Sequence, residues 1–121
     1  MARSIAKDNS ELVRAIVELR RAARAQKAPI WASAADRLER SRHQVVPVNV
    51  GHLERLAAAD ETILVPGKLL AEGTLSKKLT VAAFAYSKEA RAKIHAAGGV
   101  AITLHDLLKI RPDGAGVRLF A

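Results

Sequence analysis

A segment rich in lysine and glycine is the part of this sequence best suited to bind phosphate. Its cationic side chains are Lys68, Lys77 and Lys78. We expect it to open with a Pro66-Gly67 turn and to connect two apolar β-strands, at 62–65 and 79–86. Lysine ammonium groups and loop N–H groups on such a rigid frame attract anions. The segment therefore predicts phosphate binding rather than catalysis.

Residue types that perform catalysis are scarce or poorly spaced in the rest of the chain. The sequence has no cysteine, which excludes thiol nucleophiles, cysteine-ligated metals and disulfides. Its four histidines show no metal-binding spacing, and Gly67-Lys68 lacks the flanking residues of a Walker A loop. The dipeptide His105-Asp106 is interpreted as a helix start with a capping aspartate. A small hydrolase built on that pair is an alternative that would need a concave site.

Positive charge is concentrated in two segments of the chain. The 121 residues include 20 Lys and Arg against 12 Asp and Glu, a formal net charge of +8. Most of the excess lies between residues 20 and 43 and between residues 67 and 93. A basic domain of this size suggests a polyanionic partner, although basic segments can also be solvated surfaces. Aromatic residues make up only 3%, too few for a multi-base stacking platform.

The first basic segment supplies most of the residues that we expect to contact phosphate. They are Arg20, Arg21, Arg24, Lys27, Arg37, Arg40, Arg42 and His43. Arginine suits this role because its guanidinium makes bidentate phosphate contacts, whereas lysine acts as a point charge. Glu18, Asp36 and Glu39 are close enough in sequence to compete for some of these arginines.

The pattern of apolar residues and capping signals predicts a mixed α/β fold in a single domain, 1–121. An N-terminal basic arm of two helices, within 1–43, precedes a compact core of short strands with interspersed helices, 44–121. The expected helices are 10–26, 29–40, 51–58, 87–97 and a short one from 103, and the expected strands are 45–50, 62–65, 79–86, 100–102 and 117–120. The single tryptophan, Trp31, is expected to be a packing anchor. Neither a membrane span nor a secretory signal is apparent.

Several strings along the chain resemble one protein family. They are N-S-E-L, A-P-I-W, V-N-V-G-H-L, I-L-V-P-G-K-L-L, K-K-L-T-V-A-A-F-A-Y-S and A-R-A-K-I-H-A-A-G-G. Together they resemble the archaeal and eukaryotic large-subunit ribosomal protein family eighteen-e, which is related in fold to bacterial ribosomal protein fifteen. The resemblance covers nearly the whole chain, and the short length looks like the archaeal form.

The resemblance implies a structural constituent of the large ribosomal subunit that supports translation. Its expected partners are large-subunit ribosomal RNA and neighbouring ribosomal proteins, in the cytoplasmic ribosome. It implies no catalysis, no cofactor or metal, no small-molecule substrate and no membrane contact. The alternative is a non-ribosomal nucleic-acid-binding module, such as a small DNA-compacting protein.

Overall fold

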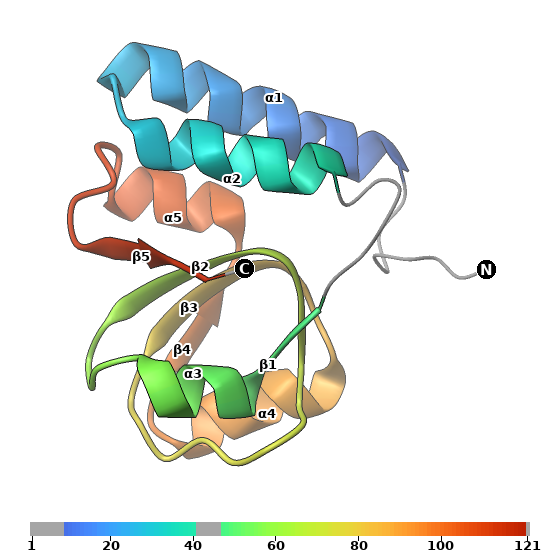
Figure 1. Ribbon diagram of the computed structural model, residues 1–121, viewed down its shortest axis with the longest axis vertical. Coiled ribbons are helices and arrows are strands. Elements are labelled where there is room, and N and C mark those ends of the chain that lie inside the picture. The colour runs from blue at the N-terminus through green and yellow to red at the C-terminus, as the bar shows by residue number, and fades with distance from the viewer. Residues whose placement is uncertain (1–8, 41–46, 121) are drawn as a thin grey trace.

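The computed structural model describes residues 9–40 and 47–120, which form five helices and five strands. The helices are α1 (Asn9–Gln26), α2 (Pro29–Arg40), α3 (Val50–Leu56), α4 (Lys88–Ala96) and α5 (Leu104–Ile110). The strands are β1 (Val48–Asn49), β2 (Thr62–Leu70), β3 (Thr80–Tyr86), β4 (Val100–Ile102) and β5 (Val117–Leu119). Two N-terminal helices followed by mixed strands and helices confirm the predicted fold class (Figure 1).

All strand pairs of the sheet are parallel, and the order is β1-β2-β3-β4. The short strand β5 also pairs with β2, at the opposite end of β2 from β1. Residues 81–85 of the central strand β3 are buried throughout. A parallel sheet covered on both faces requires such a continuous apolar strand, as the sequence predicted.

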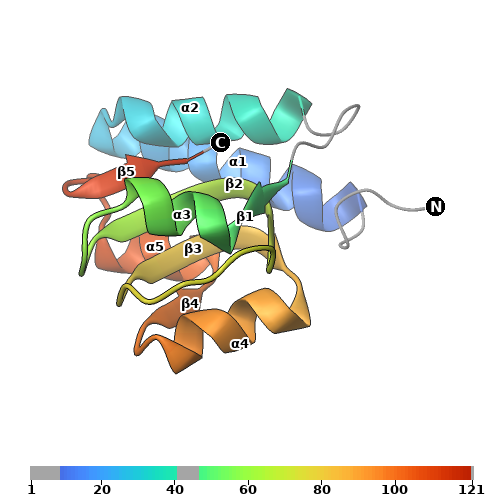
Figure 2. The same cartoon turned by 60° about the horizontal axis from the view of Figure 1, so that its bottom comes forward.

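Two layers of helices cover the two faces of the sheet (Figures 1 and 2). Helices α1, α2 and α5 share one apolar cluster with Leu64, Ala82 and Phe84. Helices α3 and α4 share the other cluster with residues of the opposite face, such as Ile63 and Val81. The basic arm therefore packs directly on the sheet, and its inner face is part of the core.

Trp31 anchors the arm, as the sequence predicted. Its side chain is fully buried, and its indole Nε1 donates a hydrogen bond of 2.8 Å to the carbonyl oxygen of Pro112. The bond satisfies the only polar atom of the ring and ties the turn before β5 to α2.

Local capping signals confirm the starts of α4 and α5. The Ser87 side chain accepts a hydrogen bond from the Ala90 N–H at 3.1 Å. Thr103 and Asp106 form a reciprocal capping box at the start of α5. The interpretation of Asp106 as a capping aspartate is thus confirmed, and His105 is exposed on the first turn of that helix.

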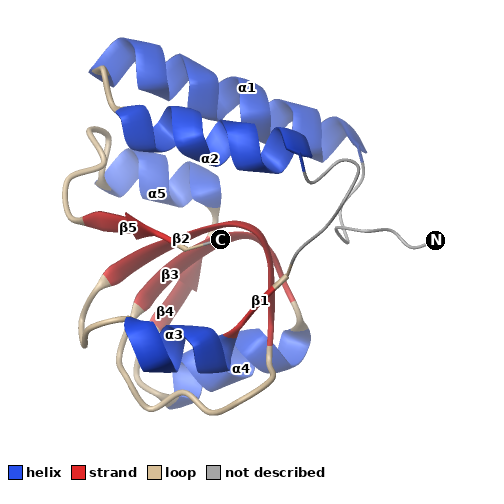
Figure 3. Cartoon of the chain, viewed as in Figure 1, coloured by secondary structure: helices blue, strands red, loops and turns tan. Residues whose placement is uncertain are grey.

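The predicted turn at Pro66-Gly67 is wrong, because β2 continues through it to Leu70 (Figure 3). The register with β3 shifts there: Val65 pairs with Ala83 and Lys68 with Ala85. Between these pairs β2 has one residue more than β3, which makes a β-bulge. A bulge interrupts the hydrogen-bond ladder, so the missing N–H of Pro66 costs little at this point. The loop after β2 therefore begins at residue 71.

Candidate nucleic-acid interface

Arg20 links the two helices of the arm. Its Nη2 lies 3.2 Å from Asp36 Oδ1 and 3.2 Å from Glu39 Oε1, both on α2. Hydrogen bonds to Glu39 and then to Asp36 raise the pKa of Arg20 above its ordinary value. Two carboxylates therefore share this charge, which confirms that part of the basic segment pairs within the arm. Arg20 is correspondingly less available to phosphate than its neighbours.

Three other predicted residues lie at the end of α1 and just after it. Arg21, Arg24 and Lys27 are exposed, and they make no ion pair within the described residues. Lys27 follows the helix in the left-handed conformation, at φ 51°. Their charges therefore face solvent at one end of the arm.

Helix α5 brings two further cations to the same end of the molecule. It packs beside α1 in the shared apolar cluster, and His105 Nδ1 contacts Glu18 Oε2. The two helices run in the same direction, so their C-terminal turns lie at one end (Figures 1 and 3). Lys109, in the last turn of α5, and Arg111, just after it, are both exposed. Sequence reasoning missed these two residues, because the sequence does not reveal that α5 packs beside α1.

Two further predicted arm residues, Arg37 and Arg40, lie at the opposite end of α2. Arg37 and Arg40 are exposed in its last turn, where cations also favour the helix dipole. Arg40 has no ion pair within 9–40 and 47–120. Arg42 and His43 lie outside the described residues. The arm thus presents cations at both ends rather than in one cluster.

The three lysines of the core are not brought together. Lys68 is half-buried in β2 beyond the bulge, opposite Ala85, whereas Lys77 and Lys78 precede Thr80 at the start of β3. Since a strand advances about 3.3 Å per residue, Ala85, the partner of Lys68, and Thr80 are about 16 Å apart along β3. Lys77 also donates to the Ala57 carbonyl oxygen at 2.5 Å, while Lys78 is exposed. Lys68 and Lys78 therefore lie on different parts of the surface.

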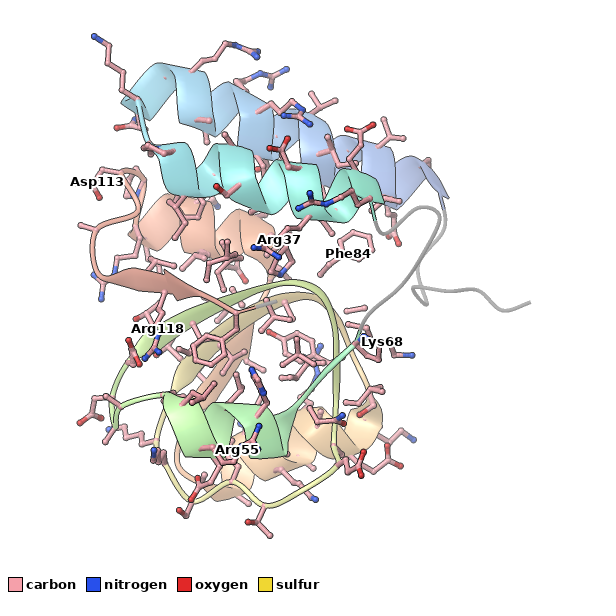
Figure 4. All side chains as sticks on the ribbon, in the orientation of Figure 1. Arg37, Arg55, Lys68, Phe84, Asp113 and Arg118 are labelled. Carbon is pink, nitrogen blue, oxygen red and sulfur yellow. The ribbon has the colours of Figure 1, made fainter. Side chains whose placement is uncertain are left out.

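A second group of cations, also missed in the sequence, lies on the α3 side of the sheet. Arg55 and Arg118 project there (Figure 4). Arg55 Nη2 lies 3.2 Å from His52 Nδ1. Arg118 donates to the Leu56 carbonyl oxygen at 2.9 Å and lies over the Phe120 ring at 5.0 Å. Only the pairing of β5 with β2 brings residue 118 near residue 55.

Other kinds of site find no support in the part of the chain that the structure describes. There, no three acidic, histidine or cysteine side chains gather as metal ligands. None of the described helices is both long and apolar enough to cross a membrane. The shallow pocket beside His105 is lined by Glu11, Glu18, Thr103 and neighbours, without a nucleophile positioned by a base. The arrangement can bind an extended anion at several points.

Comparison with known proteins identifies the family. A family model that describes ribosomal proteins 50S-L15 and 50S-L18e, together with their 60S counterpart, matches residues 32–102. A protein of Methanopyrus kandleri is 44% identical over 116 residues, 92% of this chain and 91% of the relative. A protein of Pyrobaculum aerophilum is 46% identical, with the same shares covered. One of Haloarcula marismortui is 40% identical over 95% of this chain and 98% of the relative.

All three relatives carry the name large ribosomal subunit protein eL18. The alignments include the arm and the sheet, and the family model covers more than half of the sequence. The resemblance found in the sequence is thereby confirmed: the chain belongs to the family of ribosomal proteins 50S-L15 and 50S-L18e and their 60S counterpart.

Proposed function

We propose that this protein is a structural constituent of the large ribosomal subunit and binds its ribosomal RNA through exposed basic side chains. The observation that carries this function is the family membership, since the relatives named for the large ribosomal subunit align over almost the whole chain. The net charge of +8 suits an RNA partner. In this role the protein resides in the cytoplasmic ribosome, contacts neighbouring ribosomal proteins and performs no catalysis.

Arg21, Arg24 and Arg40 are the arm residues best placed to hold phosphate. Each is exposed and lacks an ion pair within the described residues, so binding RNA does not first require breaking an internal contact. Each phosphate contact releases condensed counterions, which makes affinity depend on salt. Lys27, Arg37, Lys68, Lys77 and Lys78 are the further candidates, and Arg20 contributes chiefly by holding α1 against α2.

The salt dependence of RNA binding tests this assignment. We expect the triple variant Arg21→Ala, Arg24→Ala, Arg40→Ala to bind large-subunit RNA fragments more weakly. Its plot of log affinity against log salt should be flatter by about 2 to 3, since each lost phosphate contact removes roughly 0.7–0.9 from the slope. Lys88→Ala, which removes an exposed charge on α4, is the control and should change the slope little. An unchanged slope in the triple variant would remove these arginines from the interface.

Sedimentation separates the ribosomal function from the alternative. The protein should co-migrate with large subunits on a sucrose gradient and remain bound at elevated salt. A small DNA-compacting protein would instead leave the ribosomal fractions and bind duplex DNA more tightly than ribosomal RNA. That second pattern would overturn the proposed function.

A further inference from the structure

A groove of about 560 Å³ lies where α3 begins, on the face of the sheet opposite the arm. Six of its lining residues matter here: Asn49, Gly51, His52, Arg55, Glu72 and Gly73. Its size falls within the range of about 300–1,000 Å³ that is usual for sites holding a small molecule or a single group. Among the residues that the structure describes, no basic side chain of the arm lines it.

One wall of the groove is the loop after β2, and hydrogen bonds hold it from the start of α3 and from α4. The Glu72 carbonyl oxygen accepts from the Gly51 N–H at 3.0 Å, and the Glu72 N–H donates to Asn49 Oδ1 at 3.1 Å. Lys93 Nζ, from α4, donates to the carbonyl oxygens of Ala71 and Gly73 at 2.7 and 2.5 Å. A wall fixed in this way is formed before any ligand arrives.

Two glycines let the backbone of this wall touch the start of α3. A Cβ atom on Gly73 would lie 2.7 Å from the Gly51 Cα, and one on Gly51 would lie 3.2 Å from the Gly73 Cα. Gly73 also adopts φ +97°, which side chains rarely allow. Contact between two bare backbones leaves the groove without side chains at this point.

Arg55 and His52 supply hydrogen-bond donors from the other wall. A guanidinium has no acceptor, so the 3.2 Å contact between Arg55 Nη2 and His52 Nδ1 requires an unprotonated Nδ1. In the tautomer that accepts this bond at Nδ1, Nε2 carries the N–H group and can donate it. The His52 ring meets the buried Phe120 ring edge to face at 5.8 Å, which fixes its orientation. Arg55 is exposed and retains its other N–H groups.

We propose that this groove binds a single unpaired guanine base of the RNA, an inference that rests on the proposed function. The exposed Glu72 in the lining disfavours a phosphate, because both are anionic. A base edge instead offers acceptors and donors together. Guanine presents O6 and N7 as acceptors, which suit Arg55 and His52, and an N–H edge that suits the carboxylate of Glu72. Sequence-specific RNA recognition commonly uses unstacked bases in this way.

Chemical footprinting with kethoxal, which modifies the N–H edge of unpaired guanines, tests the proposal on large-subunit RNA. At saturating wild-type protein, at least one unpaired guanine should become protected. Arg55→Ala and Glu72→Gln should each restore its reactivity, and Arg55→Ala should weaken RNA binding by roughly tenfold to a hundredfold, as for a lost bidentate base contact. Lys88→Ala is the matched control on the same side of the sheet and should leave the protection intact.

The outcomes separate this proposal from the function beneath it. RNA binding by the wild type without any guanine whose protection depends on Arg55 and Glu72 overturns the groove assignment alone. Failure of the wild type to bind ribosomal RNA removes the proposed function and the groove assignment together. If Arg55→Ala and Glu72→Gln gave wild-type footprints but entered the large subunit poorly, the groove would hold a neighbouring protein. That result would also overturn the proposal. Thermal unfolding of each variant checks that it is folded.

Discussion

At the scale of single residues, the hydroxyl of Tyr86 joins β3 to its neighbour β4. Its oxygen accepts from the Ala83 N–H at 3.0 Å and lies 2.8 Å from the Val81 carbonyl oxygen and 2.5 Å from that of Ile102. Burial raises the pKa of Tyr86 from 10.0 to about 12, more than the hydrogen bond from Ala83 lowers it. The folded state therefore favours the protonated phenol.

Tyr86 is the only tyrosine, so its ionisation can be followed by tyrosinate absorbance. We expect a midpoint near pH 12 in the folded protein and near pH 10 in urea. Because the native pKa is the higher one, the stabilisation that the protonated Tyr86 gives the fold is complete below pH 10. It is lost as the pH rises toward 12. Tyr86→Phe should lower the free energy of unfolding by about 1–3 kcal/mol, since the Ala83 N–H loses its acceptor. A native midpoint near 10 would contradict this account.

Residue types could be predicted from the sequence, but their pairing could not. Arg20 and Arg21 are adjacent and chemically identical, yet only Arg20 faces the carboxylates of α2. The rotation of α1 against α2 determines which of the two arginines forms the ion pairs. The same limit explains why Arg55 escaped notice, since its partner His52 and the ring of Phe120 meet only in the folded chain.

At the scale of elements, local signals predicted most helices and strands. These signals act within a few residues, as do the caps Ser87 and Thr103 and the apolar run before Tyr86. The elements that they specify can therefore be predicted from the sequence alone. The Pro66-Gly67 pair predicts a turn, but proline and glycine also occur at β-bulges, as they do here. The choice depends on β3, whose register absorbs the extra residue of β2. Long-range pairing decided the outcome against a strong local signal.

The loop after β2 offers a test of how firmly the groove is built. Gly73→Ala should lower the free energy of unfolding by about 2–4 kcal/mol, since it combines strain at positive φ with a contact of 2.7 Å to the Gly51 Cα. Gly116→Ala is the control: it has φ +75° and nothing within 4 Å of the added Cβ. It should cost only the conformational part, about 1–2 kcal/mol. Equal losses in urea unfolding would show that the backbone contact carries no energy.

At the scale of the whole molecule, the sheet separates two surfaces that differ in chemistry. The arm presents exposed arginines above one face, and the groove presents mixed donors and a carboxylate beyond the other. The parallel strand order follows from pairings between distant residues, such as Thr62 with Val117, which no local pattern encodes. Leu19, Trp31 and Leu38 of the arm are buried in the core that the arm shares with the sheet.

Separation by the sheet predicts that the two surfaces act independently on one RNA. Arg21→Ala with Arg24→Ala weakens contacts at the arm, and Arg55→Ala weakens the groove. Sites more than about 7–10 Å apart without shared partners usually add within roughly 0.3–0.5 kcal/mol. The combined variant should therefore lose affinity by the product of the two separate fold-changes, within about a factor of two, in titrations with a large-subunit RNA fragment.

The salt dependence distinguishes the two contributions within the same experiment. Arm substitutions should flatten the slope, because they remove phosphate contacts, whereas Arg55→Ala should lower affinity with little change in slope, because a base contact releases few counterions. If Arg55→Ala had no effect on RNA affinity while the arm was intact, one RNA would not engage both faces together. The groove would then belong to a separate binding event, and the protein would not bridge two parts of the RNA across its sheet.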